Sequence, residues 1–255
     1  MAKIVVLGDI HGRTCWYDII KKENPDLTIF LGDYVSTHDR NITAEQQCSN
    51  LEDILNYKEA NPDKVILLRG NHDMQHLGYY WAECSGYFSK VANWMKSIKD
   101  RFINLTQWIY IHDNIIFSHA GLSKTWCKNI GIDDYSDINS LYRINDINPS
   151  EVFGFTPERL SDWSGDSKTQ PLTWIRPYSL IADALDNYIQ VVGHTKLNTP
   201  GNVFELDDPY WKELSNKEYR EKNNINAKEL WFIDCLPEQY MVIENNKREM
   251  RNWQK

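Results

Sequence analysis

Short apolar runs that end in glycine and then a polar residue recur along this chain, and they constrain its fold more than any other feature. The first run reads VVLGDIHG; it ends at Gly8, and Asp9 and His11 follow. Runs of this length, rich in β-branched residues and closed by glycine, are typical of strands that are buried on both faces. Such strands are predicted at Ile4–Leu7, 27–31, 64–68 and Ile189–Val192.

The segments around these strands predict a mixed α/β fold. Between the second and third strands, Ala44–Ala60 has helical character, and Thr43 with Gln46 forms a capping box at its start. Strand, helix, strand is the order of a crossover α/β sheet. Two apolar runs flank Asp113 and Asn114, which predicts a β-hairpin and therefore antiparallel strands. Further strands are predicted in GNVFEL, ELWFIDC and QYMVIE, at 201–206, 229–235 and 239–244.

Other parts of the chain carry weaker patterns. Residues 78–105 are expected to be mainly helical, and 211–228 to form an exposed loop or helix. Residues 122–171 are polar and interrupted by Gly, Asp and Pro, which suggests a variable insert of helix and loop. A chain of 255 residues is long enough for one large α/β domain, and we expect residues 1–255 to form a single domain.

Charge and cysteine content limit the classes of function. The formal net charge of −8 argues against general binding to a nucleic-acid backbone, and an anionic substrate would need positive charge concentrated locally. The five cysteines show no CxxC spacing, so free thiols are expected rather than a zinc knuckle or a disulfide framework. No segment reads as a signal peptide or a membrane span, and we expect a cytoplasmic protein with no membrane partner.

The polar residues at the strand ends have the chemistry of a metal site. Loops at the carboxyl ends of strands in an α/β sheet converge, so we expect these side chains to meet. A single histidine at a strand end is more often a structural residue than a ligand, but the pattern occurs five times here. Oxygen and imidazole donors without thiolate suit catalytic divalent cations such as Mn, Fe or Zn. The candidates are Asp9, His11, Asp33, Asn71, His72, His119 and His194.

Five motifs in a fixed order, GDIHG, GDYV, GNHD, SHAGL and VVGHT, resemble those of the calcineurin-like metallophosphoesterases, in particular the phosphoprotein phosphatase branch and its bacterial and phage relatives. The resemblance implies two mixed β-sheets packed face to face as a sandwich, with helices outside. It implies two divalent metal ions: Asp9 and His11 hold one, and Asp33 bridges to the other. The second ion is completed by Asn71, His119 and His194, and His72 is implied as the general acid.

The implied activity is hydrolysis of phosphomonoesters by metal-activated water, without a covalent phosphoenzyme. The phosphorylated substrate could be a phosphoprotein, a nucleotide or a small phosphoester. One alternative is hydrolysis of nucleotide or dinucleoside polyphosphates, or of phosphodiesters. A non-enzymatic alternative is a metal-binding scaffold for protein interaction, against which the intact ligands at every motif argue.

The second motif departs from the resembling branch, where it continues as GDYVDRG, with an arginine that grips phosphate and an aspartate that orients the general acid. Here Ser36, Thr37 and His38 stand at those places. Asp39 and Arg40 either restore the phosphate clamp through a longer loop or form a surface ion pair.

Three further arginines are candidates for contact with substrate. Arg176, between Trp174 and Pro177, is a second candidate for the clamp, because a guanidinium suits bidentate contact with phosphate; the alternative is a solvated loop residue. Arg13 and Arg69 adjoin the GDIHG and GNHD motifs and are also candidates for touching substrate.

Overall fold

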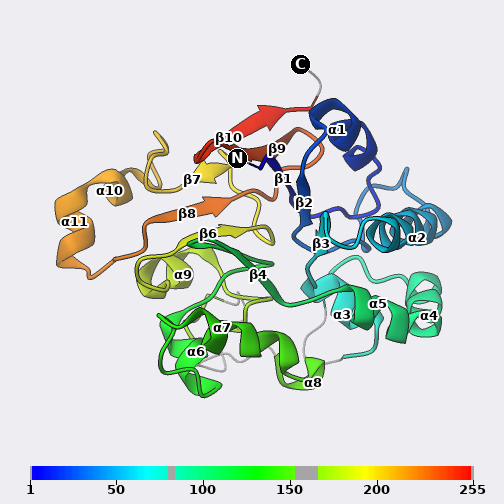
Figure 1. Cartoon of the computed structure of the whole chain (residues 1–255), viewed down its shortest axis with the longest axis horizontal. Coiled ribbons are helices and arrows are strands. Elements are labelled where there is room, and N and C mark those ends of the chain that lie inside the picture. The colour runs from blue at the N-terminus through cyan, green and yellow to red at the C-terminus, as the bar shows by residue number, and fades with distance from the viewer. Residues whose placement is uncertain (1, 80–83, 153–165, 254–255) are drawn as a thin grey trace. The chain divides into compact units, whose positions relative to one another are not determined.

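The computed structural model describes residues 2–79, 84–152 and 166–253. It divides into two compact units, one formed by Met1–Gln107 with Cys235–Lys255 and the other by Trp108–Asp234. Each unit contains one five-stranded sheet that mixes parallel and antiparallel strands (Figure 1). The prediction of an α/β fold with two mixed sheets and accompanying helices is therefore confirmed. The expectation of a single domain stays a prediction.

The sheet of the first unit has the strand order β10-β9-β1-β2-β3. Its parallel part consists of β1 (Ile4–Leu7), β2 (Leu27–Phe30) and β3 (Val65–Leu67). The antiparallel strands β9 (Gln239–Glu244) and β10 (Lys247–Asn252) extend it on the β1 side. Strand β10 was not predicted, because its sequence KREMRN lacks an apolar run; it is an edge strand, where charged side chains are tolerated.

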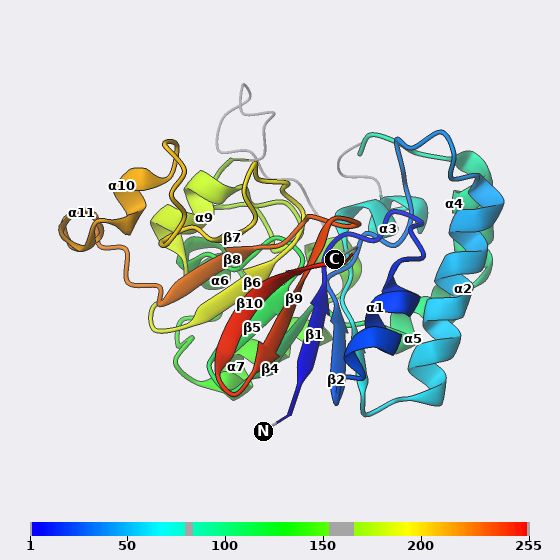
Figure 2. The ribbon, with the colours of Figure 1, turned by 90° about the horizontal axis from the view of Figure 1, so that it is seen from above.

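Two helices connect the parallel strands of this unit. Helix α1 (Trp16–Glu23) packs against β1, and α2 (Ala44–Ala60) packs against β3. Figure 2 shows both helices on the same side of β1 and β2. The predicted capping box at the start of α2 is present: Thr43 Oγ1 accepts from the Gln46 N–H, and the Gln46 side chain accepts from the Thr43 N–H.

The region 71–105 holds three further helices, α3 (Asn71–His76), α4 (Ser89–Ser97) and α5 (Lys99–Leu105). The prediction of helix for 78–105 is confirmed for α4 and α5 and wrong for 78–79 and 84–88, where the backbone turns or bends instead. Part of that prediction, at 80–83, lies outside the described residues.

The sheet of the second unit has the strand order β4-β5-β6-β8-β7. Strands β5 (Ile115–Ser118), β6 (Ile189–Val192) and β8 (Glu229–Phe232) are parallel. The antiparallel edge strands are β4 (Ile109–His112), which forms the predicted hairpin with β5, and the short β7 (Gly201–Asn202). The strand expected over 201–206 is therefore confirmed only for its first two residues.

The helices of the second unit are short. Within the expected insert at 122–171 the described residues form α6 (Lys124–Asn129), α7 (Ile138–Tyr142), a 3₁₀ turn (Arg143–Asp146) and α8 (Pro149–Val152), while 153–165 lie outside the description. Helix α9 is Pro177–Asp183. The expectation of helix in 211–228 is confirmed by α10 (Lys212–Ser215) and α11 (Lys217–Lys222).

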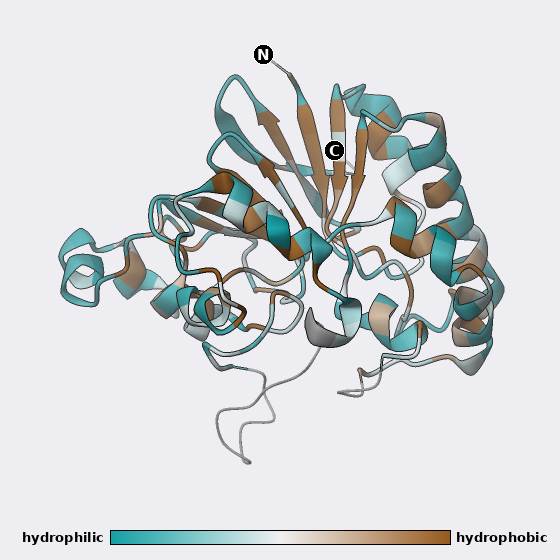
Figure 3. Cartoon of the chain, turned by 60° about the horizontal axis from the view of Figure 1, so that its bottom comes forward, coloured by the Kyte–Doolittle hydropathy of each residue, from teal (hydrophilic) through white to brown (hydrophobic). Residues whose placement is uncertain are grey.

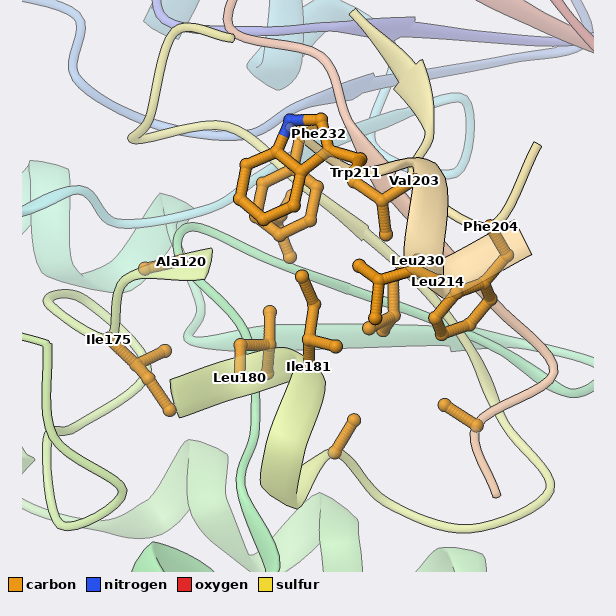
Figure 4. Packing of buried hydrophobic residues seen from close by; sticks show 13 residues of the cluster. Ala120, Ile175, Leu180, Ile181, Val203, Phe204, Trp211, Leu214, Leu230 and Phe232 are labelled. Carbon is orange, nitrogen blue, oxygen red and sulfur yellow. The ribbon is translucent and has the colours of Figure 1, made fainter. Parts of the chain in front are cut away.

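Apolar burial follows the strands. Figure 3 shows the strands mostly brown and the helices banded brown and teal, as expected for buried strands and amphipathic helices. In the second unit, Leu180 and Ile181 of α9 pack with Leu230 and Phe232 of β8 (Figure 4). None of the helices in the described ranges is long and apolar enough to cross a membrane.

Candidate metal centre

The loops that follow β1 and β2 are joined through their backbones. The His11 N–H donates to the Asp33 carbonyl at 2.7 Å, and the Gly12 N–H donates to the Tyr34 carbonyl at 2.9 Å. His11 and Asp33 both adopt positive φ, 46° and 50°, which turns each side chain at a strand end. As a result, ligand atoms of Asp9, His11 and Asp33 all lie within 4.8 Å of one another.

The His11 ring is oriented by a second hydrogen bond. Its Nδ1 lies 3.2 Å from the Val35 carbonyl, and because a carbonyl only accepts, Nδ1 carries the proton. The other ring nitrogen, Nε2, then presents a lone pair and lies 3.9 Å from Asp9 Oδ2. A histidine that donates one ring N–H to a carbonyl and turns the other nitrogen to a group of carboxylates has the usual arrangement of a metal ligand.

Two glycines allow the loops to approach each other. A Cβ on Gly70 would lie 2.1 Å from Asp33 Oδ1, and a Cβ on Gly32 would lie 2.6 Å from the Gly70 nitrogen. Gly32 also has φ +106°, a conformation that side chains rarely adopt. The glycines of the GDYV and GNHD motifs are therefore required by close packing of the two loops.

Asp73 organises this region, a role that was not predicted from the sequence. Its side chain is fully buried and accepts three backbone hydrogen bonds: Oδ2 from Asp33 and Gly70, and Oδ1 from Tyr34, at 2.8 to 2.9 Å. A buried carboxylate that accepts several N–H groups is a strong local anchor. Its position at N3 of α3, directly after a glycine N-cap, is the signal that could have identified it.

Asn71 and His72 begin helix α3, beside the donor group formed by the candidate metal donors Asp9, His11 and Asp33. The Asn71 amide nitrogen donates to Cys84 Sγ at 3.2 Å, so the amide oxygen is the atom suited to a metal. The His72 backbone N–H donates to Asp33 Oδ1 at 2.9 Å, and His72 Nε2 lies 3.9 Å from Asp33 Oδ2. The His72 ring stands edge-on to His11, with ring centroids 5.3 Å apart.

In the second unit the structure brings His119 and His194 together. They follow the adjacent parallel strands β5 and β6, and the Gly193 N–H donates to the His119 carbonyl at 2.8 Å. Their ring centroids are 5.0 Å apart, and His119 is fully buried. His194 has φ 61°, and its ring also contacts Trp174 edge-on at 5.9 Å.

Gln190 holds the loop after His119 and was not anticipated. This buried residue of β6 accepts from the Leu122 N–H at 2.8 Å through Oε1 and donates to the Leu122 carbonyl at 2.9 Å through Nε2. Gly121 in the same loop packs on α9, since a Cβ there would lie 2.4 Å from Leu180 Cδ2. A polar residue within an otherwise apolar strand was the available signal.

Arg176 and Arg69 have different surroundings. Arg176 is half-buried at the N-cap of α9 and donates to Thr195 Oγ1 at 3.0 Å and to the His194 carbonyl at 3.4 Å. Arg69 is buried and donates to Thr106 Oγ1 and to the carbonyls of Ile103 and Thr106, at 2.6 to 2.9 Å. Burial lowers the pKa of Arg69 to about 10. Its contacts favour a structural role over contact with substrate.

Arg13 and Arg40 lie in the loops around the first unit's donors. Arg13 is half-buried, bonds to the Ile10 carbonyl at 3.4 Å, and lines a cavity of about 510 Å³ together with Gly12, Asp39 and Trp253. Arg40 is exposed, and within the described ranges it makes no hydrogen bond or ion pair. Asp39 instead accepts from the backbone and side chain of Asn41, so the surface ion pair with Arg40 is not formed.

The donor set of the first unit fits a divalent cation. Asp9 and Asp33 are only 2% and 1% exposed, and a ligand oxygen of each lies within 4.8 Å of the other. Two buried carboxylates this close repel each other unless positive charge offsets them. Carboxylate oxygen with imidazole nitrogen is a common ligand combination for Mn, Fe and Zn. The residues present therefore suit the metal that the motifs imply.

Comparisons with known proteins agree with this chemistry. A family model described as calcineurin-like phosphoesterase matches residues 2–227. Similar solved structures include a cold-active protein-tyrosine phosphatase of a psychrophilic Shewanella species, with TM-score 0.58, 16% identity, and coverage of 99% of this chain and 78% of that chain. Another is a protein serine/threonine phosphatase from Saccharomyces cerevisiae, with TM-score 0.54, 15% identity, and coverage of 98% and 78%.

The solved structures support the fold, and the family model spans most of the sequence, including all five motifs. The chain belongs to the calcineurin-like phosphoesterase family, and its activity class is the metal-dependent hydrolysis of phosphoesters.

Proposed function

We propose that this protein hydrolyses phosphomonoesters at a dinuclear metal centre, using metal-activated water. The observation that carries the proposal is the group of Asp9, His11 and Asp33, whose ligand atoms lie within 4.8 Å of one another and whose carboxylates are buried. When bound, two divalent cations supply an activated water and offset charge on the phosphoryl oxygens.

The residues proposed to hold the two ions are those that the motifs imply. Asp9, His11, Asp33 and Asn71 follow β1, β2 and β3, and Asp33 would bridge the ions; His119 and His194 follow β5 and β6. The assignment is supported by the match of the motifs to the family and by the donor chemistry within each unit. Mn, Fe and Zn are the proposed metals because imidazole and carboxylate ligands suit them.

His72 is proposed as the general acid for the leaving oxygen. Its backbone N–H is anchored on Asp33 Oδ1, and its Nε2 lies beside the donor group rather than within it. A proton delivered from Nε2 to the leaving oxygen contributes roughly 10² to 10⁴ in rate when the leaving group is poor.

The arginines are proposed to hold the phosphate. Arg176 is the first choice, since its guanidinium is fixed by Thr195 Oγ1 next to His194 and is still half-exposed. Guanidinium groups bind phosphate oxygens bidentately and stabilise the charge that develops on them. Arg40 and Arg13 are alternative phosphate contacts, because both lie in loops adjoining the first unit's donors.

The proposed substrate is a phosphomonoester, which is the substrate class of the tyrosine phosphatase and the serine/threonine phosphatase that share this fold. A second candidate is hydrolysis of nucleotide or dinucleoside polyphosphates or of phosphodiesters. This second candidate is favoured by Ser36, Thr37 and His38, which stand where the resembling branch carries Asp-Arg-Gly with its phosphate-gripping arginine. The proposed compartment is the cytoplasm, which is supported by five cysteines that are present as thiols and not as disulfides.

Metal removal and restoration test this function. The purified protein would be dialysed against chelator, assayed on an aryl phosphate, and assayed again with Mn added; we expect loss and recovery of turnover. Asp33→Asn is expected to lose metal, whereas His72→Ala is expected to retain metal and lose most turnover on poor leaving groups. A metal-binding scaffold would give no turnover in any of these samples.

A panel of substrates decides the class. Phosphopeptides, mononucleotides and dinucleoside polyphosphates would be compared by kcat/KM under one metal condition. The proposal expects the highest value among the monoesters. A clear preference for dinucleoside polyphosphates or phosphodiesters would replace it with the second candidate.

A further inference from the structure

Ser36 makes an unusual set of polar contacts beside His72. Its Oγ lies 2.8 Å from His72 Nδ1, 2.9 Å from the Ser85 carbonyl and 2.8 Å from the Gly86 carbonyl. The residue is 2% exposed, and within the described residues these are the three polar contacts of its hydroxyl.

The hydroxyl has one proton, and both carbonyls can only accept. If that proton pointed to His72, the Ser36 oxygen would face both carbonyl oxygens with no proton between them, which is repulsive. The proton therefore points to the carbonyl of Ser85 or Gly86. Toward His72 the Ser36 oxygen can only accept. It follows that Nδ1 of His72 carries a proton and donates it to Ser36.

The position of the hydroxyl is determined by the backbone around it. Ser36 has φ 71°, and its N–H donates to Oε1 of the buried Gln47 at 2.8 Å. The 84–86 segment approaches closely, since a Cβ on Gly86 would lie 2.7 Å from Ser36 Oγ. The acceptor is therefore held in place from both sides before any substrate binds.

We propose that Ser36 is a positioning residue for His72: it accepts the Nδ1 proton and so reserves Nε2 as the only ring position that exchanges a proton with substrate. The inference rests on the proposed general-acid role of His72 and deepens it. Ser36 does this as a neutral group, so it orients the ring without adding a negative charge to it.

The proposed step is hydrolysis with one proton delivered by His72. Attack of the water oxygen forms a new P–O bond; one proton of that water stays on the phosphate and the other goes to solvent, and the bond from phosphorus to the leaving oxygen breaks with its electron pair on that oxygen. The leaving oxygen takes the Nε2 proton of the His72 imidazolium. His72 is left neutral, with its remaining proton on Nδ1 and still donated to Ser36 Oγ.

Two variants remove the acceptor. Ser36→Ala deletes the hydroxyl, and Ser36→Gly does so while adopting positive φ without strain. For an alkyl phosphate we expect kcat to fall about 10- to 100-fold, a part of the contribution of a general acid, with KM little changed. For an aryl phosphate with a strongly acidic phenol, whose departure needs no proton, we expect kcat to change by less than about threefold.

A matched control removes a neighbouring hydrogen bond. His38 Nε2 bonds to Ser85 Oγ at 3.1 Å, which joins the same loop to the same 84–86 segment without touching His72. His38→Ala is therefore expected to keep the parental dependence on leaving group. Thermal unfolding and metal content would be measured for all variants.

A spectroscopic readout does not depend on turnover. In the metal-loaded parent, ¹⁵N shifts of the His72 ring in its neutral form are expected to report the Nδ1–H tautomer, and Ser36→Ala is expected to lose it. An Nε2–H tautomer in the parent would overturn the role of Ser36. Equal losses of kcat on the alkyl and the aryl phosphate in the Ser36 variants would also overturn it. Parental behaviour of His72→Ala on alkyl phosphates would instead overturn the general acid itself, and with it this inference.

Discussion

The His11 backbone N–H donates to the Asp33 carbonyl at 2.7 Å, which ties together the loops that follow β1 and β2. Because this bond is made by the backbone, substituting either side chain leaves it intact. The geometry of the first unit's donors can therefore be tested by changing the residues packed around them.

Gly70→Ala should weaken metal binding through steric contact alone. Gly70 has φ −101°, which alanine adopts without strain, but its Cβ would lie 2.1 Å from Asp33 Oδ1. We expect Asp33 to be displaced and metal affinity to fall about 10- to 100-fold, measured by titration calorimetry. Gly131→Ala is the control for a Cβ without steric contact: it meets nothing within 4 Å, and although φ +80° makes alanine strained there, parental affinity is expected. Parental affinity in Gly70→Ala would contradict the close packing.

Asp73→Asn should destabilise the first unit. One carboxylate oxygen would become an NH₂ group, which cannot accept from the N–H groups that Asp73 now satisfies at Asp33, Tyr34 and Gly70. We expect a loss of about 2 to 4 kcal/mol in the free energy of unfolding, measured by urea denaturation. Asp63→Asn, at an exposed position, is expected to change it by less than about 0.5 kcal/mol. Equal effects of the two substitutions would refute the anchoring role.

Arg69→Ala should affect stability rather than substrate binding. The buried guanidinium satisfies two carbonyls at the end of α5 and the Thr106 hydroxyl. We expect a loss of about 2 to 4 kcal/mol in the free energy of unfolding and an unchanged KM. The control is Arg101→Ala: Arg101 lies on α5 and pairs with Glu52 and Glu59 near the surface. Its substitution is expected to lower the free energy of unfolding by about 1 kcal/mol or less. A raised KM with parental stability would identify Arg69 as a substrate contact.

Arg176→Ala and Arg40→Ala distinguish the two candidates for the phosphate clamp. Arg176 is held by Thr195 Oγ1 beside a proposed ligand, whereas Arg40 is exposed. We expect kcat/KM to fall about 100-fold in Arg176→Ala and to change little in Arg40→Ala, with metal content unaffected in both. The reverse order of effects would assign the clamp to the loop after β2.

His76 should make stability depend on pH. Burial lowers its pKa below the ordinary value of 6.5; Nδ1 donates to the His72 carbonyl, and Nε2 accepts from the Phe88 N–H. The unfolded chain therefore takes up the proton at higher pH than the folded chain. Stability is fully present above pH 6.5 and is lost as the pH falls from 6.5 toward the folded pKa.

His76→Gln removes this titration. Urea unfolding of both proteins with chelator, from about pH 7.5 to about pH 5, should show a steeper loss of stability on acidification in the parent. Identical pH slopes would mean that the His76 pKa does not differ between the folded and unfolded states.

The sequence by itself determined the elements whose signals are local. Apolar runs closed by glycine predicted β1, β2, β3 and β6, and the Thr43 capping box predicted the start of α2. The motifs also identified which side chains carry oxygen or imidazole donors. These features depend on residue type and spacing over a few positions, so they can be read without knowing what lies opposite.

Only the tertiary structure decided which partner each polar group has. Asp73 bonds to residues 33 and 34, Ser36 to carbonyls of 85 and 86, and Arg69 to the end of α5, and the local sequence indicates none of these partners. The 84–88 segment and β10 were likewise missed, because contacts with distant residues outweigh their own weak preferences. A hydrogen bond depends on where two atoms meet in space, and that position is set by packing of the whole unit.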